Sequence, residues 1–253
     1  MGRFGSSVDG GTGNFATLLA LEKSRPMRQC SVGGVRFDFL RTQTLGFKGV
    51  LETKKIPTLF KRVFDDGGVV EVLPEVREGL EWVLRGEGVA TEKVDGSACA
   101  VIDGVLYKRF DAKNGKEPPK GAIPCQPQPD PYTGHWPHWV KVDTRLKADK
   151  WFVRAWTNTP WIGESLADAD GTYEAVGLHF QGNPYGLDDD FLERHGRIKI
   201  KDCPRTFEGI MEYLRTHEIE GIVWHRGNGE MCKIKRSDFG FKWPTDYWRA
   251  DNG

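Results

Sequence analysis

Two pairs of short apolar runs, each joined by a turn, constrain the fold of this chain more than any other feature. Ser97–Ile102 and Val105–Phe110 are rich in small, β-branched and aromatic residues, and only Asp103-Gly104 separates them. Because Asp-Gly favours a two-residue hairpin turn, this stretch predicts two antiparallel strands. Two more predicted strands, Gly221–Trp224 and Met231–Lys235, flank the turn-forming segment Arg226–Gly229.

The rest of the chain adds more strand-like than helical segments. Strand-like composition recurs at 139–142, 151–156 and 173–178, and the proline-rich stretch 118–137 predicts an irregular loop. Helical spacing of apolar residues predicts one helix from Pro74 to Arg85 and another from Phe207 to His217, with Thr206 as its N-cap. Because strands dominate and no long repeat is present, the predicted class is α+β, with mainly antiparallel sheets and few helices.

A single continuous domain over residues 61–253 is the simplest packing of these segments. Residues 1–60 mix Gly, Ser and Thr with short apolar pieces such as Val35–Leu40. We expect them to form a peripheral N-terminal segment.

Charge and cysteine content narrow the setting of the protein. The 253 residues include 36 Lys and Arg against 36 Asp and Glu, which excludes a uniformly basic nucleic-acid coat but allows a local basic groove. The five cysteines are odd in number and contain no CxxC pair, which favours a reducing compartment. No apolar run reaches the roughly 18 residues of a membrane span. We therefore expect a cytoplasmic protein without membrane insertion.

Lys93 lies in an unusual local setting. The motif Lys93-Val-Asp-Gly96 offers an amine, a carboxylate two residues later and a glycine that allows close approach of a ligand. Taken alone, these four letters also fit a solvated lysine in a turn.

Distant residues supply the groups that such an amine needs. Glu220 precedes an apolar strand, and Lys233 and Lys235 share one face of the next strand because side chains alternate. Attack on the α-phosphate of a purine triphosphate requires a nucleophile, cations, carboxylates for hydrated magnesium and an apolar slot for the base. The chain contains each of these groups.

The order of four motifs resembles the covalent nucleotidyltransferases, which include polynucleotide ligases and messenger-RNA capping enzymes. The motifs are KVDG (93–96), YEAVG (173–177), EGIV (220–223) and KIK (233–235). Four longer motifs give a closer resemblance to the vertebrate-type, ATP-dependent RNA ligase family, which joins 5′-phosphate and 3′-hydroxyl ends. These motifs are TEKVDG (91–96), GNPYGL (182–187), IEGIVWH (219–225) and GFKWP (240–244). The resemblance extends over about residues 88–245.

This resemblance implies an adenylyltransferase domain with an ATP-grasp-like nucleotidyltransferase fold over 61–253. Only eighteen residues follow Lys235, so we expect no C-terminal OB-fold. Lys93 would attack ATP and carry AMP as a phosphoramide, and the AMP would pass to the RNA 5′-phosphate before the 3′-hydroxyl displaces it. Neighbouring cations would lower the pKa of the Lys93 amine.

The resemblance also implies further residue roles. Lys233 and Lys235 would act in catalysis at the α-phosphate, and Glu220 would order Mg²⁺ or Mn²⁺. Glu174 would contact the ribose or the metal's water shell. The remaining nucleotide-binding residues would be Glu92, Asp95, Arg109 and Val223, with Arg109 near the ribose or phosphate and Val223 as a wall of the adenine slot.

Several alternatives stay open at the level of sequence. The chain could be a nucleotidyltransferase with another acceptor or with GTP as donor, or a non-catalytic relative that binds RNA or nucleotide. The latter would be expected to lose Lys93 or Glu220, and both are present. The basic run from Arg194 to Lys201, which contains His195, fits either phosphate contacts or a solvated face. Tyr185, within GNPYGL, fits either packing or an RNA-facing rim.

Overall fold

The computed structural model describes residues 56–65, 68–113, 115–131, 133–159 and 169–244. Apart from 56–60, the predicted N-terminal segment, including Val35–Leu40, lies outside the described residues. The described residues fall within one compact unit that spans 42–253.

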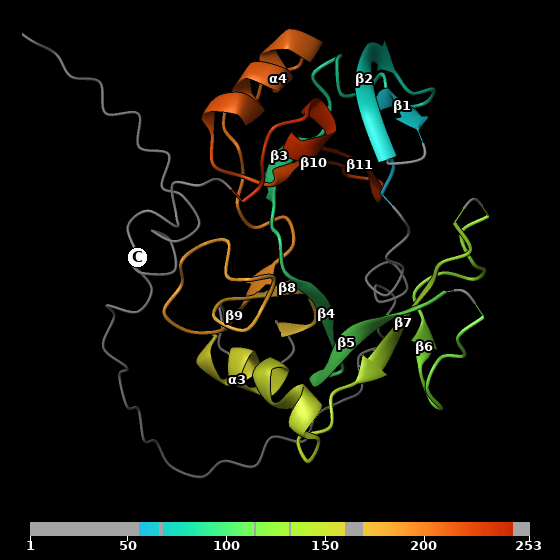
Figure 1. Ribbon diagram of the computed structural model, residues 1–253, viewed down its shortest axis with the longest axis vertical. Helices are drawn as coiled ribbons and strands as arrows, with labels where there is room; N and C mark the ends of the chain where they lie inside the picture. The colour runs from blue at the N-terminus through green and yellow to red at the C-terminus, as the bar shows by residue number, and fades with distance from the viewer. Residues whose placement is uncertain (1–55, 66–67, 114, 132, 160–168, 245–253) are drawn as a thin grey trace, which may run out of the picture. The chain divides into compact units, whose positions relative to one another are not determined.

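Antiparallel sheets make up most of the regular secondary structure of the described residues (Figure 1). The larger sheet has six strands in the order β6-β7-β5-β4-β8-β9, and the smaller has three in the order β11-β10-β3. A separate β1–β2 ribbon completes the set. The strands are β1 (Phe60–Asp65), β2 (Gly68–Val76), β3 (Val89–Lys93), β4 (Ser97–Ile102), β5 (Val105–Ala112), β6 (Ile123–Pro124), β7 (Trp136–Lys141), β8 (Gly171–Val176), β9 (Phe191–Arg194), β10 (Gly221–Arg226) and β11 (Glu230–Lys235).

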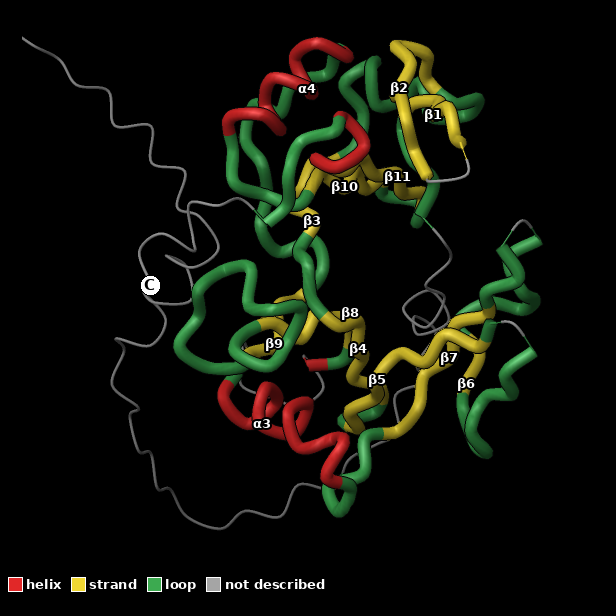
Figure 2. Tube along the Cα trace, viewed as in Figure 1, coloured by secondary structure: helices red, strands yellow, loops and turns green. Residues whose placement is uncertain are grey.

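Helices are few in the described part of the chain. It contains two α-helices, α3 (Lys150–Asn158) and α4 (Phe207–Thr216), and short 3₁₀ turns at Lys147–Asp149 and Arg236–Phe239 (Figure 2). The predicted α+β class with mainly antiparallel sheets is therefore confirmed. No helix among the described residues is long and apolar enough to cross a membrane.

Local sequence signals explain the best-predicted elements. Asp103 and Gly104 adopt φ values of 50° and 70°, which is the backbone expected of the Asp-Gly hairpin between β4 and β5. In α4, the Thr206 hydroxyl accepts a hydrogen bond from the backbone N–H of Gly209, as expected of an N-cap. Both predictions are confirmed.

The strand predicted at 151–156 is wrong, because this segment lies in α3. Its aromatic and β-branched residues suggested a strand. However, the apolar residues Trp151, Phe152, Ala155 and Trp156 follow helical spacing, and they pack on the core of the larger sheet. Tertiary burial of this one face outweighs local strand propensity.

The helix predicted from Pro74 to Arg85 is also wrong. Strand β2 continues to Val76, which pairs with Phe60 of β1, and a series of turns follows. Leu80 and Val83 are buried, but their backbone N–H groups donate to the carbonyl three residues earlier, as in turns, and no regular helix forms. Gly79, with φ of +83°, interrupts the helical backbone.

The two faces of the smaller sheet have different partners. Ile222, Trp224 and Ile234 are fully buried and pack with Ile210 and Leu214 of α4. Residues that alternate with them project to the opposite face. One face of this sheet thus builds a core and leaves the other for a cavity.

Candidate active site

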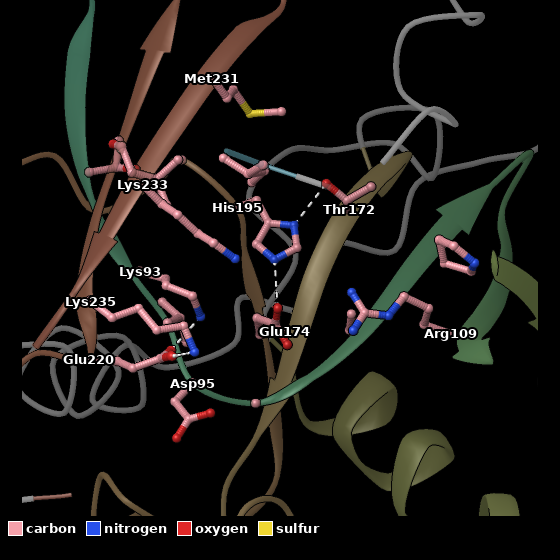
Figure 3. Close-up of a pocket in the computed structure, with 18 of the residues that line it drawn as sticks. Lys93, Asp95, Arg109, Thr172, Glu174, His195, Glu220, Met231, Lys233 and Lys235 are labelled. Carbon is pink, nitrogen blue, oxygen red and sulfur yellow. Dashed lines mark hydrogen bonds and ion pairs between the residues drawn. The ribbon is translucent and has the colours of Figure 1, made fainter. Parts of the chain in front are cut away.

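The open face of the smaller sheet aligns the predicted residues in rows. Lys93, Gly221 and Lys235 are register partners across β3, β10 and β11, and the next row contains Thr91, Val223 and Lys233. Because opposite residues share a face, both lysines of β11 lie on the side of Lys93 (Figure 3). The prediction that Lys233 and Lys235 share a face is confirmed.

Gly221 is required for this close alignment. A Cβ atom at this position would lie 2.3 Å from the carbonyl oxygen of Ile234 and 3.0 Å from the Cα of Lys235. Any side chain at Gly221 would therefore push β10 and β11 apart. The glycine of EGIV keeps the two lysines within reach of Lys93.

Glu220 joins two of the lysines. Its Oε2 lies 2.5 Å from the Nζ of Lys93, and its Oε1 lies 2.9 Å from the Nζ of Lys235. The exposed fractions are 7% for the Glu220 side chain, 19% for Lys93 and 37% for Lys235. Burial opposes the charge of Lys235, but Glu220 outweighs it and raises the pKa of Lys235. A nearly buried carboxylate thus holds two amines in place.

Lys233 lies in the same cavity under less favourable conditions. Burial, and then the positive charges of Lys93 and Lys235, lower its pKa to about 8. Two hydrogen bonds to one neighbouring segment fix its backbone, because its N–H donates to the Pro57 carbonyl and its carbonyl accepts from the Leu59 N–H. The fold thus places a partly buried cation beside Lys93.

Asp95 lies at the bend after β3, close to the lysine group formed by Lys93, Lys233 and Lys235 (Figure 3). Its Oδ2 accepts a hydrogen bond of 2.9 Å from the indole N–H of Trp243. Burial and then the charge of Glu220 raise the pKa of Asp95, against the opposing effects of Trp243 and the nearby lysines.

Glu174 faces the cavity from β8 of the larger sheet. Its Oε1 lies 3.1 Å from Nε2 of His195, whose Nδ1 lies 2.9 Å from the Thr172 hydroxyl (Figure 3). With Nε2–H donating to the carboxylate, Nδ1 accepts from Thr172. The Glu174 Oε2 atom is buried and accepts no hydrogen bond from the described residues.

Two predicted residues lie apart from the lysine group. Arg109 of β5 forms an ion pair with Asp111 at 3.2 Å, and Glu174 and His195 separate it from Lys93 in Figure 3. Glu92 pairs with Ile222, so its side chain belongs to the rear face, where burial and then Glu193 raise its pKa to about 7. Contacts of Arg109 or Glu92 with a nucleotide stay predictions.

All nine predicted site residues nevertheless line one cavity of about 560 Å³. This volume lies within the range of small-ligand sites. Cations gather at one end of the sheet face, and Val223 and Met231 give the neighbouring wall an apolar character. The cavity can therefore hold a molecule that combines a flat apolar part with an anionic part.

Polar contacts that the sequence did not predict surround these residues. His195 was predicted only as part of a basic run, and Thr172 lies directly before the motif YEAVG. The Nε2 of His225 lies 3.0 Å from the Thr91 hydroxyl, and both residues line the cavity. Burial, and then His195, lower the pKa of His225. Thr91 lies two residues before Lys93 on the same strand, so the alternation of side chains could have predicted that Thr91 faces the same cavity.

The carboxylates fit a hydrated divalent cation better than a fully protein-ligated one. Among the described residues, no group of three His, Cys, Asp or Glu side chains has metal-binding geometry. Mg²⁺ usually keeps several waters and takes one or two carboxylates together with substrate phosphates. Glu220 and the unpaired, buried Oε2 of Glu174 suit that kind of site.

Comparisons with known proteins show similarity to RNA ligases. The family described as RNA ligase 1 matches residues 164–251, which include Glu174, Glu220, Lys233 and Lys235. RNA ligase 1 of Rattus norvegicus is 29% identical over 223 residues, and RNA ligase 1 of Mus musculus and of Danio rerio are each 28% identical over 223 residues. Each alignment covers 62% of this chain and 68% of the relative. Over these residues the chain is similar to the RNA ligase 1 family.

Proposed function

We propose that this protein is an ATP-dependent RNA ligase that joins 5′-phosphate and 3′-hydroxyl ends through a covalent lysyl-AMP on Lys93. The observation that carries the proposal is the contact between the Lys93 amine and Glu220, with Lys235 on the same carboxylate and Lys233 in the same cavity. The names of the similar proteins supply the RNA ligase class.

In the first step, the Nζ of Lys93 attacks the α-phosphorus of ATP. An N–P bond forms, the bond to the bridging oxygen breaks, and pyrophosphate leaves. The amine must first be deprotonated to be nucleophilic. Glu220 Oε2, at 2.5 Å, is placed to accept that proton. The same carboxylate orients the amine through a charge-assisted hydrogen bond.

The other lysines act on the phosphate. A pKa of about 8 leaves Lys233 mostly protonated at pH 7, so it provides positive charge in a partly dehydrated site. The raised pKa of Lys235 keeps its cation as well. Both positive charges stabilise the negative charge that develops on the α-phosphoryl oxygens.

The remaining residues bind and orient the nucleotide. Val223 forms part of the apolar wall for the base, and the unpaired Oε2 of Glu174 can accept a hydrogen bond from a ribose hydroxyl. Glu220 and Glu174 would hold Mg²⁺, or Mn²⁺, through its water shell. When bound, the metal would neutralise phosphate charge and polarise the reacting phosphoryl group.

Two transfers complete the proposed reaction. The RNA 5′-phosphate takes AMP from Lys93, which restores the free amine. The 3′-hydroxyl of the second RNA end then attacks the activated 5′-phosphate, so a phosphodiester bond forms and AMP leaves.

A sealing assay tests this proposal. The full chain is incubated with MgCl₂, ATP and a 5′-phosphorylated RNA that also has a 3′-hydroxyl, and products are separated on a denaturing gel. Wild-type protein and Lys61→Ala should seal the RNA, because Lys61 is an exposed lysine paired with Glu75. Lys93→Ala should lose sealing with ATP but retain sealing of RNA that already carries 5′-AMP.

The outcome distinguishes the rival functions. GTP in place of ATP, and DNA ends in place of RNA ends, should each give much less product. Wild-type protein that seals neither substrate would contradict the proposal, and equal use of GTP or DNA would replace the stated donor or acceptor.

A further inference from the structure

Two of the motifs that resemble the RNA ligase family, GNPYGL and GFKWP, both contact Asp95, which lies two residues after Lys93. The backbone N–H of Asp95 donates to the Tyr185 hydroxyl at 2.6 Å, and the Trp243 indole N–H donates to Asp95 Oδ2 at 2.9 Å. The two rings also contact each other, with centroids 5.9 Å apart. Two residues that lie 90 and 148 positions from Asp95 in the sequence thus hold Asp95, in the loop 94–96 that follows Lys93.

The next residue of the loop is held as tightly. The side-chain amide of Gln181 donates to the carbonyl of Gly96 at 3.2 Å. A Cβ atom on Gly96 would lie 2.5 Å from the carbonyl oxygen of Ala175, so only glycine fits against β8. The short connection between Lys93 and β4 is therefore fixed from several directions.

Tyr185 is a firm anchor. It is buried, and its loop is braced by Asn183, whose side chain donates to the carbonyl of Leu187 at 2.9 Å and accepts from the N–H of Leu187 at 3.0 Å. Burial raises the pKa of Tyr185 well above its usual value, so the phenol stays neutral. The hydroxyl oxygen is thus available as an acceptor over the working pH range.

Trp243 links Asp95 to the other side of the site. It follows Lys235 by eight residues, and Asp238 in between accepts the backbone N–H of Lys235 at 2.8 Å and the Arg62 guanidinium at 3.1 Å. Arg236 further closes this segment by donating to the carbonyl of Lys242 at 2.8 Å. The segment therefore connects the strand that carries Lys235 to the loop that follows Lys93.

From this geometry we infer that Tyr185 and Trp243 are positioning residues, which fix the 94–96 loop through Asp95 and so direct the Lys93 amine towards Glu220. Neither residue is among those that line the cavity. The inference rests on the proposed function, because Lys93 is the nucleophile that the loop would position. It differs from a packing role in that one N–H and one hydroxyl carry the effect.

The test compares Trp243→Phe and Tyr185→Phe with wild type in attachment of labelled AMP from ATP. Phenylalanine keeps an aromatic ring and removes only the indole N–H or the phenol hydroxyl. Loss of a hydrogen bond to a charged group should slow labelling at saturating ATP about 10- to 100-fold for Trp243→Phe. The ATP concentration for half-maximal rate should change less than about twofold. Tyr185→Phe should slow labelling about 3- to 10-fold.

Trp136→Phe is the matched control. It removes an indole N–H that donates to the Gln126 carbonyl at 2.8 Å instead of to Asp95, and it should label within about twofold of wild type. In an Asp95→Ala background, Trp243→Phe should add less than about a twofold effect, because its partner carboxylate is already absent.

Three results would overturn the inference: Trp243→Phe and Tyr185→Phe that both label like wild type, an effect confined to the ATP requirement, or an undiminished Trp243→Phe effect without the Asp95 carboxylate. If thermal unfolding shows that Trp243→Phe does not fold, Tyr185→Phe alone decides between these results. Wild-type protein without label would instead contradict the proposed function itself.

Discussion

Replacing Lys233 with methionine tests whether the site holds a charge at the expense of stability. Burial and the neighbouring lysines lower the pKa of Lys233 from 10.5 to about 8. At about 1.4 kcal/mol for each tenfold change in the acid dissociation constant, the folded state disfavours this cation by roughly 3 kcal/mol. Methionine fills similar space without charge, and the backbone bonds to Pro57 and Leu59 are unaffected.

The Lys233→Met variant should therefore be more stable than wild type by about 1–3 kcal/mol at pH 7, while it loses AMP attachment. Below pH 8 both the folded and unfolded chains carry the charge, so the penalty is complete. Between pH 8 and 10.5 the folded chain loses its proton first, and the penalty declines. The stability difference between variant and wild type should shrink over that range.

Urea unfolding of the full chain at pH 7 and pH 9.5 measures this difference. Lys61→Met, at an exposed lysine, should change the free energy of unfolding by less than about 0.5 kcal/mol at either pH. A Lys233→Met variant that is less stable than wild type at pH 7, or a gain that is equal at the two pH values, would refute the electrostatic reasoning.

Three further predictions address the supports of the site. Gly221→Ala should lower the free energy of unfolding by about 1–3 kcal/mol and reduce AMP attachment, because its Cβ would lie 2.3 Å from the Ile234 carbonyl; unchanged urea unfolding would contradict this. Thr206→Ala should lower it by about 1 kcal/mol through loss of the α4 cap, with AMP attachment retained in the folded protein, and unchanged stability would argue against the cap. His195→Ala should raise the ATP concentration for half-maximal AMP attachment about 5- to 30-fold, whereas His195→Gln, which keeps a donor for Glu174, should raise it less. Equal effects of the two His195 substitutions would show that the donor is not what matters.

Much of the fold follows from local sequence. The Asp103-Gly104 turn, the Thr206 cap and the alternation of Lys233 and Lys235 are signals within a few residues, and the structure confirms each. The segment 151–156 shows the limit of such signals, because its composition favours a strand while burial against the larger sheet selects a helix.

The candidate site likewise contains some features that the sequence predicted and others that it did not. Chemical requirements linked Lys93 to Glu220 across 127 residues, and the two side chains are in contact. The contacts of Asp95 with Tyr185 and Trp243 had no comparable signal, because aromatic residues serve as packing groups in most settings. The orientation of Glu92 was predictable in principle, since adjacent strand residues point to opposite faces and Lys93 occupies the cavity side.

The most direct test of the central claim is to locate AMP on the protein. Wild-type protein is incubated with ATP and MgCl₂, digested, and analysed by mass spectrometry under conditions that preserve the phosphoramide. We expect AMP on the peptide that contains Lys93, at the Nζ atom, and no adduct on Lys93→Ala. Wild-type protein that carries no AMP, or AMP attached to a different residue, would contradict the account.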